Sequence, residues 1–199
     1  DKIPYLHEGY ARRESGQVFV RGIAIGGGAP VAVQTMCDTD TMDTAACVEQ
    51  IGRIRDAGCR IVRLTTQGKN EAGNLKNIRT ELNARGWDDM ALVADVHFNP
   101  DVALIAAEYA DKVRINPGNY RNDGGQFAAL AERCRERGVA MRIGVNHGSL
   151  ASHIVEKYGD TPGGMVESAM EYLRLCRNMD FDQVVVSMKS SNVRVMVHA

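Results

Sequence analysis

The sequence predicts an α/β fold, namely a (β/α)8 barrel of the TIM type that is truncated after about six βα units and carries an N-terminal β-hairpin. First, short β-branched runs alternate with longer amphipathic stretches, which is typical of βα units around a parallel sheet. Second, the run of three glycines, Gly26-Gly27-Gly28, precedes the first main strand, whereas a doubly wound sheet usually has its Gly-rich loop after that strand. Third, polar side chains collect at the carboxyl ends of successive strands, where barrels form their sites.

The length of the chain bears on how much of a barrel it contains. A complete barrel of this type needs about 250 residues, and the chain has 199. Its last residues, Val195–Ala199, read as a helix in mid-course. We therefore expect residues 1–199 to form an incomplete barrel domain.

The strands are predicted from apolar runs that turn residues bound. Gly26-Gly27-Gly28 is interpreted as the turn of an N-terminal hairpin in which Val18–Ile25 leads into Val31. Six strands of the main sheet follow in chain order: Val31–Met36, Arg60–Thr65, Ala91–Val96, Lys112–Ile115, Ala140–Val145 and Gln183–Met188.

Four helices are marked by their boundary residues. The first runs from about Thr44 to Ala57 and stops at Gly58. Asn99-Pro100 provides an N-cap and a first-turn proline for a helix that ends near Ala110. Gly138 ends the helix that carries Phe127 and Leu130. Thr161-Pro162 opens the last long helix, whose apolar stripe is Val166, Ala169, Met170, Leu173 and Cys176.

Composition excludes several classes of protein. The 24 lysines plus arginines against 25 aspartates plus glutamates give a formal net charge of −1, which excludes a dedicated nucleic-acid-binding protein. No apolar stretch approaches the roughly 18 to 20 residues of a membrane span, and the N-terminus lacks a secretory apolar region. The five cysteines are widely spaced without a C-x-x-C pair. This argues against a disulfide framework or a self-contained metal site and favours a reducing, cytoplasmic setting.

The predicted strands have two different faces, because residues i and i+2 point to the same side. One face is apolar, as with Val62 and Leu64, and suits covering helices. The other face becomes polar towards the carboxyl end of each strand, where it carries Arg63, Asp95, His97, Arg114, Arg142 and Lys189. In a barrel this second face lines the lumen, and active sites form at its carboxyl-end mouth.

The cations on this face predict an anion site. Gathering several of them costs desolvation and mutual repulsion, which a small anion offsets, and phosphate is the usual one. A diphosphate suits so many donors better than a single phosphate. Lys112 shares the parity of Arg114 but lies deeper, so we expect its replacement to act through stability.

Two loops agree with an anion site. Asn116-Pro117-Gly118-Asn119 has Pro-Gly at the central positions of a type II turn, which exposes backbone N–H groups near Arg114. The segment from Gly144 to Ser149 has two glycines and leads into a helix start, as phosphate-binding loops do.

Less specific interpretations of the same residues stay open. A single arginine at a strand end is more often a salt-bridge partner than a ligand contact, although Asp95 could neutralise only one of these cations. The Asp95-x-His97 pair could belong to a metal site, but no third ligand has a suitable spacing. The cysteines, including Cys37 near the mouth, are interpreted as packing residues.

Six segments now make a family resemblance recognisable. They are, in order, Val33–Met36, Ile61–Arg63, Leu92–Phe98, Arg114–Asn119, Arg142–Asn146 and Val186–Ser190. From about Gly22 onwards the chain resembles 4-hydroxy-3-methylbut-2-enyl diphosphate synthase of the non-mevalonate isoprenoid pathway, and the strings VADVHF and RINPGN are highly specific.

The resemblance implies an iron–sulfur oxidoreductase. Its substrate would be 2-C-methyl-D-erythritol 2,4-cyclodiphosphate, which is opened reductively with loss of a hydroxyl as water to give 4-hydroxy-3-methylbut-2-enyl diphosphate. Ferredoxin or flavodoxin would deliver two electrons singly. An N-terminal barrel binds the substrate in this family, and a separate C-terminal domain carries a [4Fe–4S] cluster on three cysteines and a glutamate.

Position by position, the resemblance implies which residues hold the substrate. The diphosphate and the hydroxyls would be held by Arg63, Arg114, Asn116, Arg142, Asn146 and Lys189, with Asp95 and His97 at the mouth of the same pocket. None of the five cysteines lies where the family has its cluster ligands, so these are expected beyond Ala199. The chain alone would thus be a substrate-binding barrel that binds no cluster, has no catalytic residue and is inactive.

The resemblance also implies an assembly and a location. A homodimer is expected, in the bacterial cytoplasm or, as the alternative, in the plastid stroma. The stretches Thr66–Ala72 and Ala110–Lys112 resemble the larger, three-domain branch of the family. Two other functions would explain the basic pocket alone: a transferase resembling dihydropteroate synthase, which needs no cluster, and a non-catalytic sensor of a diphosphate metabolite.

Overall fold

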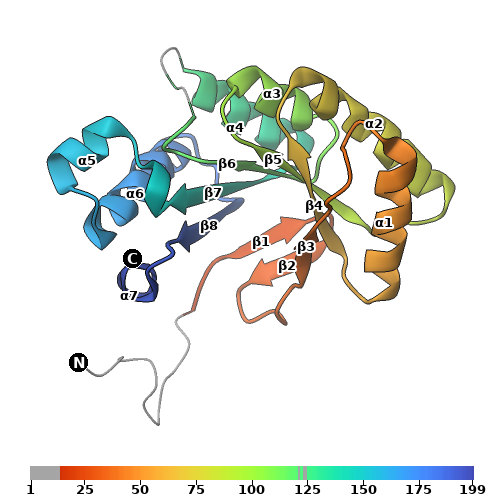
Figure 1. The fold of residues 1–199 in the computed structure, drawn as a ribbon, viewed down its shortest axis with the longest axis horizontal. Coiled ribbons are helices and arrows are strands. Elements are labelled where there is room, and N and C mark those ends of the chain that lie inside the picture. The colour runs from red at the N-terminus through yellow and green to blue at the C-terminus, as the bar shows by residue number, and fades with distance from the viewer. Residues whose placement is uncertain (1–13, 121, 123–124) are drawn as a thin grey trace, which may run out of the picture.

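The computed structural model describes residues 14–120, 122 and 125–199. Its centre is a curled sheet of six parallel strands that lie side by side in chain order (Figure 1). A doubly wound sheet would reverse its strand order at a switch point, and this sheet does not. The predicted barrel class is therefore confirmed, as an open part-barrel with the strands β3 Gln34–Met36, β4 Ile61–Thr66, β5 Ala91–Val96, β6 Lys112–Ile115, β7 Ala140–Asn146 and β8 Val184–Lys189.

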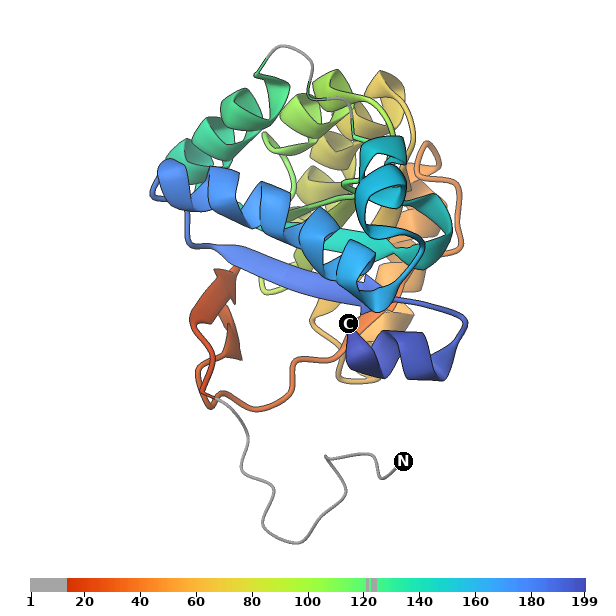
Figure 2. The ribbon, with the colours of Figure 1, turned by 90° about the vertical axis from the view of Figure 1, so that its left-hand side faces the viewer.

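The helices that connect the strands cover the convex face of the sheet and leave the concave face without helices (Figures 1 and 2). They are α1 Thr44–Asp56, α2 Lys69–Ala84, α3 Pro100–Ala106, α4 Gln126–Arg137, α5 Ser152–Tyr158 and α6 Pro162–Asn178, with a 3-10 turn at His147–Ser149, and a further helix, α7 Val193–His198, follows the last strand. None of the helices in the described ranges has the length and apolar character that a membrane crossing requires.

The capping contacts confirm the predicted helix boundaries except for the end of α3. The Thr161 side chain accepts a hydrogen bond from the Gly164 backbone N–H, and Gly138 takes a left-handed conformation at the end of α4. α3 ends earlier than predicted, at Ala106. The α-helical pattern changes to 3-10 hydrogen bonding there, because the backbone N–H groups of Glu108 and Tyr109 donate to the carbonyls three residues earlier.

The main core lies between the sheet and its helices, and it confirms the predicted strand parity. Val62, Leu64 and Val113 are buried there against residues of α1 to α4. The predicted stripe of α6 was right in part: Ala169 and Cys176 are buried, but Val166 and Met170 are exposed. The face of α6 that is buried instead consists of Met165, Ser168, Ala169, Tyr172 and Cys176, because the helix is rotated so that this row meets the sheet.

The N-terminal hairpin is present, but its turn is not the one predicted. β1 Gln17–Val20 pairs with β2 Ile23–Gly26, and the turn is Arg21-Gly22, with φ values of 48° and 78°. Both residues are left-handed, as a two-residue type I′ turn requires. Gly26 ends β2, and Gly27 and Gly28 lead towards β3.

The hairpin lies on the concave side of the sheet (Figure 1) and covers the amino ends of the strands. Val18 and Val20 form a second apolar cluster with Ile61, Ala91 and Ala140, the inward-facing first residues of three strands. The lumen is therefore apolar at the amino ends of the strands, and it stays open at their carboxyl ends.

The first strand of the sheet is shorter than predicted. Val31 and Val33 are 76% and 64% exposed, and β3 begins only at Gln34. The pairing explains the difference: Gln34 is opposite Ile61, the first residue of β4, so the residues before Gln34 have no β4 residue with which to pair.

Candidate functional site

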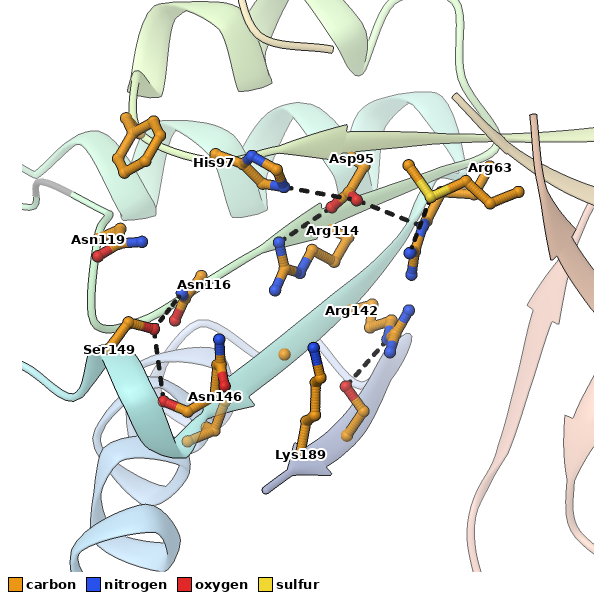
Figure 3. Close-up of a pocket in the computed structure, with 15 residues that line it drawn as sticks. Arg63, Asp95, His97, Arg114, Asn116, Asn119, Arg142, Asn146, Ser149 and Lys189 are labelled. Carbon is orange, nitrogen blue, oxygen red and sulfur yellow. Dashed lines mark hydrogen bonds and ion pairs between the residues drawn. The ribbon is translucent and has the colours of Figure 1, made fainter. Parts of the chain in front are cut away.

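A cavity of about 430 Å³ opens at the carboxyl-end mouth of the lumen (Figure 3). It has the size of a small-molecule site and receives side chains from every strand of the sheet. All eight residues predicted from the sequence line it: Arg63, Asp95, His97, Arg114, Asn116, Arg142, Asn146 and Lys189. The parallel strands bring them together because the six residues that stand on strands share the concave face of the sheet, and His97 and Asn116 directly follow β5 and β6.

Asp95 is the centre of the charge network in this cavity (Figure 3). Its side chain is 5% exposed and lies 3.0 Å from Arg114 Nη1, 3.3 Å from Arg63 Nε and 3.5 Å from His97 Nε2. Among the described lining residues it is the only carboxylate, and four residues carry a permanent positive charge. One carboxylate cannot neutralise them all.

Two of the cations have no acidic partner in the described part of the chain. Arg142 donates from Nε to Ser187 Oγ at 3.0 Å, and Lys189 is exposed at the mouth. Burial lowers the pKa of Arg142, and the positive charges of Arg63 and Arg114 lower it further, with Asp95 opposing the shift. The field at Arg142 is therefore already positive, and an anion would relieve it.

Arg63 offers an additional unfilled donor. Its Nε is buried without a hydrogen-bond acceptor, since the contact with Asp95 does not have hydrogen-bond geometry, and its Nη2 donates to the sulfur of Met36 at 3.1 Å. A buried donor without an acceptor costs free energy. An oxygen-rich ligand in the cavity would instead meet the exposed part of the Arg63 side chain, which is 25% exposed as a whole.

Neutral groups line the side of the cavity opposite Arg63 and Arg142 (Figure 3). Asn116 donates from Nδ2 to Ser149 Oγ at 2.9 Å, and Ser149 Oγ in turn donates to the Asn146 carbonyl at 3.4 Å. These bonds tie the loop after β6 to the loop after β7. The Asn116 amide is thereby held where it can contact the hydroxyls or the bridging oxygen of a ligand, and the Asn146 side chain lines the cavity beside it.

The loop after β6 differs from the predicted type II turn. Gly118 does not have the positive φ that such a turn needs, because the backbone N–H groups of Asn119 and Tyr120 both donate to the Asn116 carbonyl, as in a helical turn. Glycine is required for a different reason. A Cβ at position 118 would collide with the carbonyl oxygen of Ser149.

Met36, Phe98 and Ser187 line the cavity without having been predicted from the sequence, and Asn119, Gly144, Val145 and Ser149 belong to the two loops that were predicted to support an anion site. The parity rule could have found Ser187, because it shares the face of Lys189. Phe98 and Asn119 lie beyond strand ends, where parity carries no information.

Gly144 on β7 leaves the space that the Arg114 side chain occupies. A Cβ at this position would lie 2.8 Å from Arg114 Nε and 3.3 Å from Ser187 Oγ. Because crowding of this kind costs about 1–3 kcal/mol, we expect Gly144→Ala to displace the guanidinium and to weaken pyrophosphate binding roughly tenfold. Isothermal titration calorimetry measures the change. Gly73→Ala, where a Cβ has open space, is the control, and equal affinities in the two variants would contradict this role.

The described residues do not form a site for a metal or an iron–sulfur cluster. No three histidine, cysteine or acidic side chains gather there in a way that could hold a metal ion. The five cysteines are free and buried, and their thiols that make hydrogen bonds contact backbone carbonyls or Thr39. Burial raises the pKa of Cys37 to about 12, whereas a cluster ligand must be a thiolate. Asp95 and His97 contact each other without a third ligand.

Fold and cavity together define the class: a TIM-barrel domain with a cationic pocket at the carboxyl ends of its strands. Within that class, the chain belongs to the GcpE TIM-barrel domain family, whose model matches residues 15–199.

Curated relatives agree with the family assignment. One from Phocaeicola vulgatus is 52% identical over 94% of this chain, and one from Akkermansia muciniphila is 46% identical over 96% of it. Both carry the name 4-hydroxy-3-methylbut-2-en-1-yl diphosphate synthase (flavodoxin). The chain spans about a third of their length, 34% and 36% respectively.

Solved structures of other enzymes share the fold. A dihydropteroate synthase from Xanthomonas albilineans superimposes with a TM-score of 0.62 at 14% identity over 92% of this chain and 69% of its own. A phospho-2-dehydro-3-deoxyheptonate aldolase from Thermotoga maritima gives 0.54 at 15% identity, over 90% of this chain and 48% of its own. At such identities the likeness concerns the fold alone.

Proposed function

We propose that this chain is the substrate-binding barrel of an oxidoreductase that converts 2-C-methyl-D-erythritol 2,4-cyclodiphosphate to 4-hydroxy-3-methylbut-2-enyl diphosphate. The observation that carries the proposal is the convergence of Arg63, Arg114, Arg142 and Lys189 on one cavity with a single carboxylate. The names of the relatives supply the product of the reaction, the family resemblance in the sequence suggests the cyclodiphosphate as substrate, and the uncompensated charge supports a ligand that carries two negative charges.

In this proposal the residues of the barrel bind and orient the ligand. Arg142, Lys189 and the guanidinium of Arg63 bind the diphosphate oxygens, while Asn116 and Asn146 contact the hydroxyls. Asp95 holds Arg63 and Arg114 in place and reduces the repulsion between the positive side chains of the empty site. The binding energy of the diphosphate is thereby used to fix the carbon skeleton at the open mouth of the lumen.

The reduction itself needs groups that this chain does not provide. Opening the ring and releasing water takes up two electrons and two protons, and the described cysteines do not fit a cluster. We propose that a [4Fe–4S] cluster on residues beyond Ala199 supplies the electrons, with flavodoxin as the donor that the relatives' names indicate and ferredoxin as the alternative. This chain alone is then inactive.

The proposed assembly follows from the open mouth. A cluster domain has to reach the cavity, either from the same subunit or from the other subunit of a homodimer. That the relatives are about three times as long as this chain supports the larger, three-domain form. The cytoplasm is the proposed location, as the reducing setting for such a cluster.

The test uses the protein at its full natural length under anaerobic conditions, with reduced flavodoxin and the cyclodiphosphate. We expect formation of the open-chain diphosphate, measured by mass spectrometry, and loss of this activity in the barrel alone. Preferential binding of a pterin diphosphate would favour the transferase that resembles dihydropteroate synthase. Tight binding of the cyclodiphosphate without turnover in the reduced protein would favour a sensor. Either result would overturn the proposal.

A further inference from the structure

Lys112 lies in the lumen directly beneath the cavity. It stands on β6 two residues before Arg114 and so points to the same face, but it is 3% exposed and does not line the cavity. Its Nζ donates to Gln34 Oε1 of β3 at 2.9 Å, across the lumen. Below it, the hairpin residues Val18 and Val20 provide only apolar surface.

Among the residues that the structure describes, no carboxylate compensates the charge of Lys112. Burial lowers the pKa of Lys112 to about 8, and the charges of Arg142 and then Arg63 contribute to the shift. Asp95 of β5 is already engaged by Arg63, Arg114 and His97, and Lys189 of β8 adds a further positive charge at the mouth. Asp111 precedes Lys112 in sequence but binds Arg79, Arg21 and the Leu92 N–H instead.

A buried lysine in these surroundings destabilises the empty barrel. A lowered pKa means that folding favours the neutral amine, so the full cost of the charge applies below pH 8. The cost shrinks as the pH rises from about 8 towards the ordinary lysine value of 10.5, because the folded state then releases a proton that the unfolded state keeps. An apolar side chain would avoid the cost.

An anion in the cavity would reduce this cost. Two negative charges above Lys112 would favour its protonated form, and the low-polarity lumen would transmit the attraction better than water does. Lys112 therefore lowers the stability of the empty protein and raises its affinity for the anion. Functional sites commonly combine these two effects.

We propose that Lys112 is a supporting cation of the diphosphate site, which strengthens anion binding without touching the ligand and couples binding to the uptake of a proton. The inference rests on the function proposed above and deepens it. It also extends the expectation from the sequence that Lys112 acts through stability, since the two effects now have opposite signs.

The experiment titrates the full-length protein with 2-C-methyl-D-erythritol 2,4-cyclodiphosphate. Each phosphate of this ring has a single, strongly acidic proton, so the ligand does not titrate near neutral pH. Calorimetry in two buffers of different ionisation enthalpy between pH 7.5 and 9.5, above the ordinary histidine range, counts the protons that the protein takes up.

We expect wild-type affinity to fall as the pH rises through about 8, with uptake of about half a proton near pH 8.5 if binding raises the Lys112 pKa by one unit. The same unit corresponds to roughly tenfold affinity. Lys112→Met should therefore bind roughly tenfold more weakly at pH 7.5, take up no proton and melt at a higher temperature than the wild type. Lys76→Met, which removes an exposed lysine of α2, should behave as the wild type.

A variant that keeps the charge separates the proposal from a packing role. Lys112→Arg should retain affinity at high pH and lose proton uptake, since arginine does not titrate in this range. If the wild type binds normally without taking up a proton, or if Lys112→Met takes up as many protons as the wild type, the proposed role of Lys112 is overturned while the proposed function stands. Absence of cyclodiphosphate binding by the wild type would overturn the proposed function, and this inference with it.

Discussion

Asp95→Asn is expected to destabilise the empty protein strongly and to make its stability depend on a bound anion. The carboxylate is nearly fully buried and contacts two arginines that are themselves only 16% and 25% exposed. Removing one partner of a buried pair costs about 3–5 kcal/mol, and the partial exposure of the arginines reduces this to about 2–4 kcal/mol. Asparagine has the size of aspartate and keeps one side-chain oxygen. The loss of stability therefore reports the removal of the charge and not a change in volume.

The same change should strengthen anion binding, because the cavity loses its only negative side chain among the described lining residues. Pyrophosphate should therefore raise the melting temperature of Asp95→Asn more than that of the wild type, by mass action. Thermal unfolding with and without pyrophosphate measures both effects. Asp101→Asn is the matched control, because Asp101 forms an exposed pair with Lys69 at 2.7 Å and such pairs contribute little. Equal stability of Asp95→Asn and wild type would show that Asp95 does not hold the arginines.

Much of the site was predictable because strand geometry is simple. A residue's parity within a strand decides its face, and Arg63, Arg114 and Arg142 all stand in short β-branched runs whose apolar neighbours fix that parity. The parallel order of the strands then gathers their carboxyl ends at one mouth. The sequence could therefore predict a cationic cavity without any knowledge of side-chain contacts.

Other features depend on contacts between residues that are far apart in the sequence. The bond between Gln34 and Lys112 joins residues 78 positions apart, and no local pattern predicts it. β3 is short because β4 begins only at Ile61, opposite Gln34, and the residues of β3 itself do not reveal this. The hairpin turn was misplaced because Arg21 is an unusual first residue for a type I′ turn, whereas three glycines are a stronger local turn signal.

Arg142→Ala is expected to weaken binding of the cyclodiphosphate more than any other single change on the β7–β8 side of the cavity. A charge-assisted hydrogen bond contributes about 1.5–3 kcal/mol, which corresponds to a dissociation constant roughly 10 to 150 times higher. The Ser187 hydroxyl that accepts from Nε holds the guanidinium in position, so little entropy is lost on binding. The folded protein should not be destabilised in proportion, because Arg142 lies among like charges without an acidic partner in the described chain.

Calorimetry on Arg142→Ala should thus show weaker binding with a melting temperature close to that of the wild type. Arg177→Ala, on the exposed side of α6, removes the same charge and should leave the affinity unchanged.

Arg142→Ala also tests the coupling between Arg142 and Lys112. Because Arg142 is one of the charges that lower the Lys112 pKa, its removal should move the pH dependence of binding to higher pH. Unaltered affinity in Arg142→Ala would remove this residue from the site, and an unaltered pH midpoint would show that the two cations do not interact.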